Sequence, residues 1–256
     1  MLFKSNSMRA ILAIIFMTFV TQASAECGGM CDRKFWLHAT IADVKRAIDK
    51  GEDINQRNSQ GNGPLTWASS YSDFEIFKFL IEQGADIHAR NLSGHTPLVS
   101  AKDPEKVEYL IRLGADVDLD LKGGLTVFIF HSGSQCRIES LKLLQQAGAN
   151  PYARNENGTS ALHWAAMWSS PIECLDYLLE TGLQIDSRTR TGNTPLHEAA
   201  QCPLSCKSHV IPWLLSKGAD PRAKNSDGKT PWDLAQENEE LKGSKAFWAL
   251  NDAYYK

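Results

Sequence analysis

Pairs of glycines recur along most of the chain, and the two glycines of a pair are always ten residues apart. The first glycines are Gly51, Gly84, Gly114, Gly148, Gly182 and Gly218, and the second are Gly61, Gly94, Gly124, Gly158, Gly192 and Gly228. Successive first glycines are 33, 30, 34, 34 and 36 residues apart, so all variation in length lies outside the ten-residue intervals. A period between about 20 and 50 residues is typical of stacked repeats, in which each unit buries its apolar face against its neighbours. We therefore expect a solenoid rather than a domain built around one central core.

Each segment from a second glycine to the next first glycine predicts two helices. It begins with a pattern such as Thr96-Pro97, in which Thr suits the N-cap and Pro suits the first helical position. After a turn, apolar residues follow at helical spacing, as in Phe77, Leu80 and Ile81. The next glycine then ends this second helix. The ten residues between paired glycines are polar and turn-rich, which predicts an extended hairpin.

Two short motifs resemble those of a known family. Residues 194–200 read TPLHEAA, residues 162–166 read LHWAA, and variants follow the other second glycines. These motifs and their period resemble the ankyrin repeat over about residues 35–250. The resemblance implies an all-α repeat solenoid that binds partner proteins through a concave face of hairpin tips and first helices. It also implies that His163 and His197 hydrogen-bond to the backbone between repeats.

The glycines divide the chain into about six to seven units, counting both caps. We predict an N-terminal cap and divergent first repeat at 26–60, five repeats at 61–93, 94–123, 124–157, 158–191 and 192–227, and a C-terminal cap at 228–256. Three repeats depart from the pattern. The 94–123 unit is three residues short, the 124–157 unit has large residues where the family has small ones, and the 192–227 unit has extra residues near 202–206. We expect a compressed turn in the first case and altered packing in the second.

The first 25 residues predict a cleaved signal peptide. Lys4 and Arg9 precede an uncharged apolar run at 10–20, and residues 23–25 (ASA) form a cleavage site before Glu26. A membrane anchor is the alternative, but spanning a bilayer takes about 20 apolar residues. We therefore expect an exported chain, periplasmic or extracellular, that is monomeric and free of the membrane. Its start and its C-terminal helix also resemble small exported ankyrin proteins of proteobacteria.

Six cysteines in an exported chain are expected to pair. Cys27 and Cys31 are four residues apart, as are Cys202 and Cys206, so each pair is predicted to close a local bridge. Cys136 and Cys174 both lie near the start of a second helix in adjacent repeats, which makes a third bridge feasible. A Cys174–Cys206 bridge competes with it, and buried free thiols are the alternative.

Catalytic and nucleic-acid functions find no support in the sequence. The formal net charge is −3, without the basic excess that phosphate binding usually needs. Metalloprotease, serine-hydrolase, phosphate-loop and CxxC motifs are absent. We predict no catalytic residue, no metal and no cofactor. His131 replaces a residue that is small in the family, and it has no evident nucleophile or carboxylate partner.

The expected binding surface combines cations with aromatic side chains. A basic column (Arg57, Arg90, Arg154, Arg188 and Lys224), interrupted by Asp120, lies at one position of the hairpins. The first helices end with Trp67, Tyr71, Trp164, Met167 and Trp168. Aromatic residues and arginines are enriched at interface hot spots. We predict that Tyr71, Arg90, Arg154, Trp168 and Arg188 contact a partner. The alternatives are a basic column that serves solubility and rings that fold onto neighbouring repeats.

The sequence thus favours an exported, non-catalytic scaffold that binds another protein, of unknown identity, through its concave face. Two alternatives stay open. One is a periplasmic protein that uses its cysteine pairs in oxidative protection. The other is a secreted effector that binds a host protein.

Overall fold

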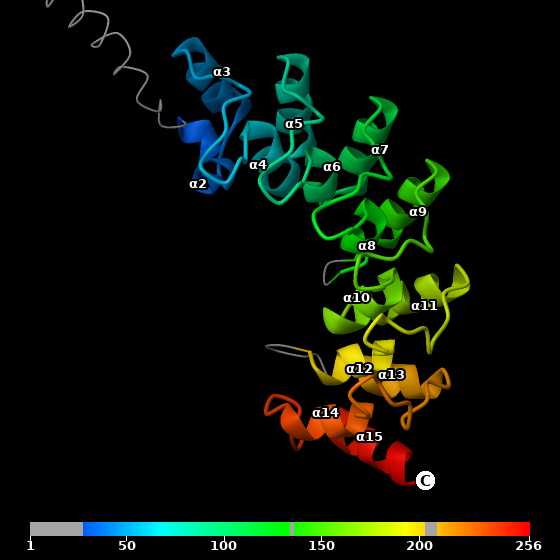
Figure 1. Cartoon of the computed structure of the whole chain (residues 1–256). Coiled ribbons are helices and arrows are strands. Elements are labelled where there is room, and N and C mark those ends of the chain that lie inside the picture. Colours follow the sequence, from blue (N-terminus) through cyan, green and yellow to red (C-terminus); the bar gives the residue numbers. More distant parts are fainter. Residues whose placement is uncertain (1–27, 134–135, 203–208) are drawn as a thin grey trace, which may run out of the picture.

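The chain folds into a curved stack of helix pairs, as the repeat predicts (Figure 1). The computed structural model describes residues 28–133, 136–202 and 209–256. These residues form fourteen α-helices and a 3-10 helix, η1. The elements are η1 (Gly29–Cys31), α2 (Arg33–Trp36), α3 (Ile41–Asp49), α4 (Pro64–Tyr71), α5 (Phe74–Glu82), α6 (Pro97–Ser100), α7 (Pro104–Arg112), α8 (Val127–His131), α9 (Ile138–Gln146), α10 (Ala161–Met167), α11 (Ile172–Glu180), α12 (Pro195–Ala200), α13 (Val210–Ser216), α14 (Pro231–Glu237) and α15 (Lys245–Tyr255).

The helices form two rows that follow the same arc. The even-numbered helices α2 to α14 lie along the inner side, and the odd-numbered helices α3 to α13 lie along the outer side (Figure 1). Each helix packs against its partner in the pair and against the equivalent helix of the next pair, as α10 does against α8, α11 and α12. The buried apolar side chains form one continuous cluster from Met30 to Leu250. The last helix, α15, packs on α13 and α14 and so covers the final repeat, as expected of a cap.

The inner helices begin where their caps predict. The hydroxyl groups of Thr96, Thr126 and Thr230 accept hydrogen bonds from the backbone N–H three residues later. These bonds satisfy N–H groups that have no partner within the helix. The predicted hairpins are tighter than extended strands. The described residues contain no β-strand, only an isolated antiparallel bridge between Asp120 and Thr126.

Consecutive hairpins are joined by backbone hydrogen bonds at their glycine tips. In one of them, Arg190 N–H donates to the carbonyl oxygen of Asn157 at 2.9 Å. The neighbouring Gly158 has a φ of +75°, and a Cβ there would lie 3.0 Å from the nitrogen of Arg190. This close approach and the left-handed backbone both require glycine, which explains why the second glycine of each pair recurs.

Two buried histidines also connect neighbouring units, which confirms the bonding that the resemblance implies. His163 Nε2 donates to the carbonyl oxygen of Asn193 at 3.2 Å, and its Nδ1 accepts from the hydroxyl of Ser160 at 2.8 Å. His197 repeats the pattern with the carbonyl oxygen of Lys229 at 3.1 Å. Because Nε2 faces a carbonyl and Nδ1 accepts, each ring is used in its neutral form.

A disulfide joins Cys136 to Cys174, with Cα atoms 6.2 Å apart. This bond connects the segment before α9 to α11 of the next unit. Cys31 and Cys202 are also disulfide-bonded. Their partners in the predicted local bridges, Cys27 and Cys206, lie outside the described residues.

Alanine substitutions at two hairpin glycines test the need for close approach between hairpins, one of them serving as the matched control. Gly158→Ala is expected to lower the free energy of unfolding more than Gly228→Ala. Both glycines have a φ of +75°, but a Cβ at Gly228 meets nothing within 4 Å. The backbone penalty alone is about 1–2 kcal/mol, and disturbing the Arg190–Asn157 bond adds about 1 kcal/mol at position 158. Urea denaturation of both variants measures the difference, and equal losses would contradict this account.

The buried histidines predict that stability falls on mild acidification. Burial lowers the pKa of His163 from 6.5 to about 4, against the opposing effect of the Asn193 carbonyl. The unfolded chain therefore takes up a proton near pH 6.5, and the folded chain only near pH 4. Folding stability is complete above this window and decreases as the pH falls through it. His163 accounts for about 3 kcal/mol of that decrease, at 1.36 kcal/mol per pKa unit.

Denaturation curves between pH 7 and pH 4.5 test this dependence. Carboxyl groups whose pKa is lowered, such as Asp43 and Asp233, titrate below the window. Burial raises the pKa of Glu198, so this group makes stability increase as the pH falls, opposite to His163. The pH dependence of the native chain is therefore compared with that of His163→Gln, in which Glu198 is retained. We expect a smaller pH dependence in that variant. An unchanged slope would show that His163 does not carry the effect.

Candidate functional site

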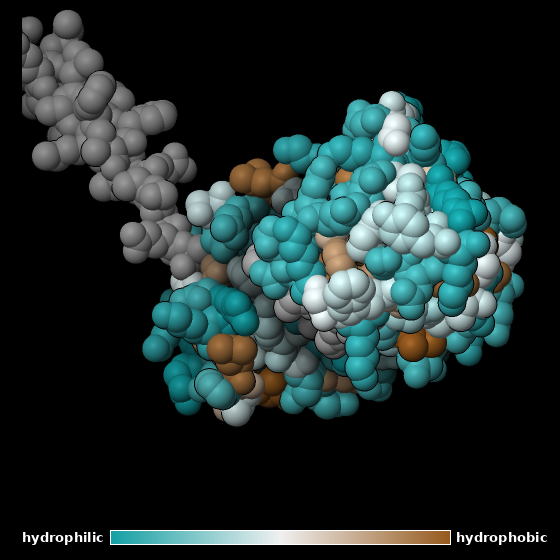
Figure 2. Space-filling view, turned by 90° about the horizontal axis from the view of Figure 1, so that it is seen from below, coloured by the Kyte–Doolittle hydropathy of each residue, from teal (hydrophilic) through white to brown (hydrophobic). Residues whose placement is uncertain are grey.

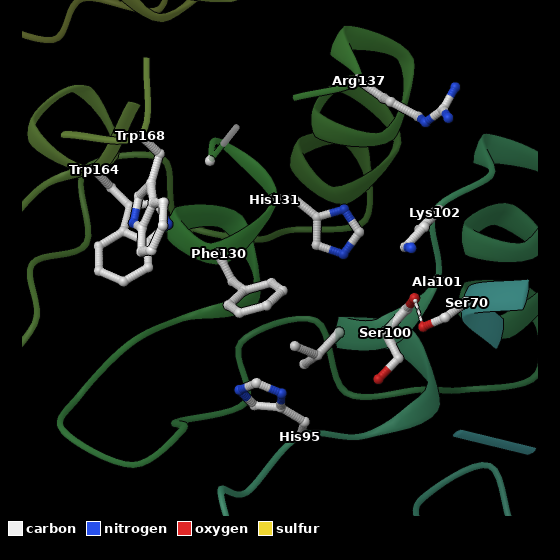
Figure 3. Close-up of a pocket in the computed structure, with 12 residues that line it drawn as sticks. Ser70, His95, Ser100, Ala101, Lys102, Phe130, His131, Arg137, Trp164 and Trp168 are labelled. Carbon is white, nitrogen blue, oxygen red and sulfur yellow. Dashed lines mark hydrogen bonds between the residues drawn. The ribbon is translucent and has the colours of Figure 1, made fainter. Parts of the chain in front are cut away.

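A hollow on the inner side of the stack results from the short 94–123 unit. Its inner helix, α6, has four residues, whereas α4 has eight and α10 has seven. The missing turn leaves a cavity of about 430 Å³ between these elements. The lining residues come from α4, α6, α8 and α10, from the segments that follow these helices and from His95, just before α6 (Figure 3).

The size of the side chain at one position of the inner helices α4 to α14 determines how much of the inner face is filled. The fourth residue after each N-cap gives the series Trp67, Ser100, Phe130, Trp164, Glu198 and Leu234. Ser100 is the smallest member and stands between two aromatic residues. The hollow therefore opens where a short helix and a small side chain coincide.

Two tryptophans form one wall of this groove. Trp164 and Trp168 lie with ring centroids 5.8 Å apart, and 45% of Trp168 is exposed. A Cβ on Gly133 would lie 3.1 Å from Trp164 Nε1, so glycine there lets the ring lie against the loop. Directly after Trp168, Ser169 has a φ of 51°, a costly conformation for a residue with a side chain. This left-handed residue ends the chain's helical course directly after Trp168, the C-cap of α10.

The floor of the groove consists of aromatic and imidazole rings. Phe130 and His95 meet edge to face at 4.8 Å. His131 Nε2 hydrogen-bonds to the carbonyl oxygen of Leu98 at 3.1 Å. Burial lowers the pKa of both histidines, so both are neutral near pH 7. His131, which stood out in the sequence, therefore ties α8 to α6 and offers its Nδ1 as an acceptor.

Cations form the opposite wall. Figure 3 shows Lys102 and Arg137 on the side of the hollow away from Trp164 and Trp168. Lys102 Nζ lies 4.6 Å from the ring centroid of Tyr71, and Arg33 Cζ lies 4.8 Å from the same ring. A cation over an aromatic face is attracted by its quadrupole. Tyr71, predicted as a partner contact, is half-buried and positions Lys102.

A buried lysine supports this wall from behind. Lys106 has no exposed surface, and its Nζ donates to the carbonyl oxygens of Ala68 and Ser72 and lies 3.4 Å from Asp103. It thereby caps the carbonyl end of α4, next to Ser70 of the groove. Burial lowers the pKa of Lys106, although Asp103 opposes the shift.

The predicted basic column is engaged inside the stack. Arg57 donates from Nη1 to the carbonyl oxygen of Arg90 at 2.9 Å. Arg154 Nη1 likewise donates to the carbonyl oxygen of Arg188 at 2.9 Å, and Arg188 Nη1 donates to the carbonyl oxygen of Lys224 at 2.7 Å. These guanidinium groups join one hairpin to the next, so we assign Arg154 and Arg188 first to stabilising the stack. Their contact with a partner stays a prediction.

Arg90 differs from the other arginines because the next unit carries Asp120 at the equivalent position. Its side chain is exposed and forms no hydrogen bond or ion pair with the part of the chain described. Trp168 is also exposed, and it is the predicted contact that lines the groove. Sequence reasoning missed His95, Ser100, Lys102, Phe130 and Arg137. Their signal was the irregular length and composition of the 94–123 and 124–157 units.

The arrangement favours binding over chemistry. Ser70 Oγ donates to the carbonyl oxygen of Ser100 at 2.9 Å, while His131 Nε2 is bonded to Leu98, so this serine and histidine are not paired. Across the described ranges, no group of three or more His, Cys, Asp or Glu residues could hold a metal ion. The same ranges contain no helix with the length and apolar character needed to cross a membrane.

Comparison with known proteins identifies related sequences and folds. The family described as "Ankyrin repeats (3 copies)" matches residues 37–120 and 129–225. The human SH3 and multiple ankyrin repeat domains protein 2 is 28% identical over 77% of this chain and 11% of its own length. Mouse protein phosphatase 1 regulatory subunit 27 is 38% identical over 30% of this chain and 48% of its own length.

A solved structure shares the fold. The human ASB11 ankyrin repeat domain superposes with a TM-score of 0.67 at 24% identity, covering 86% of this chain and 96% of that domain. The chain spans half or less of the two relatives named above, which come from human and mouse. The resemblance to exported proteobacterial proteins therefore stays a prediction.

Proposed function

The chain belongs to the ankyrin repeat family, and we propose that it is a non-catalytic scaffold that binds another protein in the groove over α6, α8 and α10. Ankyrin repeats typically bind other proteins. One relative is named as a regulatory subunit of a protein phosphatase, which is in keeping with action through a second protein. The identity of the partner of this chain is left open.

The groove itself carries the proposal. It combines a half-buried and an exposed tryptophan, a ring-lined floor and two cations in one concavity, which is the composition of an interface hot spot. In the view of Figure 2, hydrophilic residues cover most of the molecule, and the hydrophobic patches are small and separate. A partner segment bound in the groove would contact the irregular units, while the regular units would maintain the shape of the stack.

The redox alternative receives less support than protein binding. Cys31, Cys174 and Cys202 are each disulfide-bonded and at most 5% exposed. Exchange requires a thiolate to reach a disulfide sulfur, and the burial of these three cysteines restricts attack at their sulfurs, whereas Cys136 is half-buried. The secreted-effector alternative predicts the same groove and differs only in the source of the partner.

We also propose that the chain is exported and acts as a monomer outside the cytoplasm. The basic start and apolar run at 10–20 support this, because they are typical of a secretory signal. The Cys136–Cys174 bond adds support, since such bonds persist mainly in oxidising compartments.

A matched pair of variants tests the groove. The partner is first recovered by cross-linking to the tagged chain in an extract of its source and then purified. Trp168→Ala is expected to weaken binding by more than about 2 kcal/mol, or about thirtyfold, with an almost unchanged melting temperature. Leu113→Ala removes a side chain that is 43% exposed but lies outside the groove, and it should leave binding unchanged. Loss of binding in Leu113→Ala, or full binding by Trp168→Ala, would contradict the assignment.

Export is tested by the intact mass of the purified protein, and the predicted bridges are tested by its free thiols. The intact mass of the protein purified from the periplasm or the medium is expected to begin at Glu26. Alkylation of the denatured, unreduced protein should leave all six cysteines unmodified if the three predicted bridges pair every thiol. An uncleaved N-terminus in the membrane fraction would refute export, and four or more free thiols would refute the predicted local bridges.

A further inference from the structure

We infer that the groove takes an acidic peptide segment, in which one or two Asp or Glu side chains adjoin a bulky apolar side chain. This inference rests on the proposed function and specifies the chemistry of the partner. The carboxylate lies between Lys102 and Arg137, and the apolar side chain lies against Trp164 and Trp168.

The charge of the lining supports an anionic occupant. Two lysine or arginine side chains, two neutral histidines and no acidic residue line the cavity. Neither Lys102 nor Arg137 forms an ion pair within the part of the chain that the structure describes. The formal net charge of the chain is −3, so a cavity that is lined by cations and by no acidic residue has the opposite sign of charge to the chain as a whole. A concave site lined by one sign of charge attracts ligands of the opposite sign.

Behind the wall, Arg33 adds to the positive charge, whereas the charge of Lys106 is balanced by its ion pair with Asp103. Arg33 shares the ring of Tyr71 with Lys102, and Lys106 lies close enough to Lys102 for their charges to repel. Asp103 is already paired with Lys106. A carboxylate in the groove would therefore meet an excess of positive charge, which the fold itself leaves uncompensated.

The rest of the lining fits a peptide. Trp164 and Trp168 present a large aromatic wall at the opposite side of the cavity (Figure 3). His131 Nδ1 makes no hydrogen bond among the described residues, and it accepts because Nε2 holds the proton. It is thus free to receive a backbone N–H. The groove offers complementary groups for a carboxylate, an amide and an apolar side chain.

A second hollow limits the length of the acidic segment. It has about 600 Å³ and lies towards α14, with Asp227, Glu237, Glu239 and Glu240 in its lining. Its Lys229 is already paired with Glu237 at 2.7 Å. An acidic run that continued in this direction would be repelled. The acidic part of the partner is therefore short and confined to the end of the concave face near α6 and α8.

Three labelled peptides of equal length test the inference with the full, oxidised chain. The first has two Glu residues beside a Phe, the second has Lys in place of Glu, and the third has Ala in place of Phe. Fluorescence anisotropy at low salt should show the first binding about tenfold tighter than either of the others. The advantage of Glu over Lys should shrink as salt screens the charges.

Charge-reversed variants locate the effect. Lys102→Glu and Arg137→Glu are each expected to weaken the Glu peptide about tenfold and to improve the Lys peptide. Arg112→Glu reverses an exposed charge on α7, outside the groove, and should change the affinity for neither the Glu peptide nor the Lys peptide. Lys102→Gln, which removes the charge without adding a new one, serves if Lys102→Glu lowers the melting temperature.

Two results would overturn the inference. One is a Lys peptide that binds as tightly as the Glu peptide. The other is the failure of every peptide to bind up to about 1 mM, the weakest useful affinity. If either occurs while Trp168→Ala still blocks the purified partner, the groove remains the binding site and only the acidic chemistry is wrong. If Trp168→Ala has no effect on the partner, the proposed function fails independently.

Discussion

The stack depends on polar bonds from each unit to the backbone of the next. His163, His197 and the arginines of the hairpins all donate to carbonyl oxygens about one repeat further along the chain. Apolar packing between helices tolerates sliding, whereas a hydrogen bond to one carbonyl fixes both the distance and the direction of the neighbour. These bonds set the register on which the smooth arc of helices relies. Glycine at each hairpin tip permits the same approach on the backbone side.

The groove marks the place where this regularity is interrupted. The 94–123 unit, whose inner helix α6 has four residues, carries Asp120 where the other hairpins carry a cation, and the side chain of Arg90 donates to no carbonyl oxygen among the described residues. Replacement contacts secure the irregular unit. Lys106 caps α4 from the following unit, His131 bonds to Leu98, and a disulfide fixes the segment before α9. The proposed binding groove thus adjoins the contacts that secure the short unit, and regular repeats lie on both sides of it.

The sequence predicted the periodic part of this structure well, because glycine spacing and N-cap residues act locally. It predicted the site less well, because a hollow is defined by what is missing between neighbours. Lys102 looks like any surface lysine until Tyr71 is seen beneath it, and Ser100 is informative only between Phe130 and Trp67. The bonds of Arg154 and Arg188 to the next hairpin were not foreseen, because composition does not reveal whether a donor is already used. The sequence left three possibilities for Cys174, namely a bridge to Cys136, a bridge to Cys206 or a free thiol, and the structure has the bridge to Cys136.

The Cys136–Cys174 bond also gives the molecule an uneven response to force. A repeat stack pulled from its two ends peels unit by unit, since each unit touches only its neighbours. The 38 residues from Cys136 to Cys174 would add about 130 Å to the extended chain at about 3.4 Å per residue. With the bond in place they add only the 6.2 Å between the two Cα atoms. The middle of the stack is therefore a short, inextensible segment, and it contains Arg137, Trp164 and Trp168 of the groove.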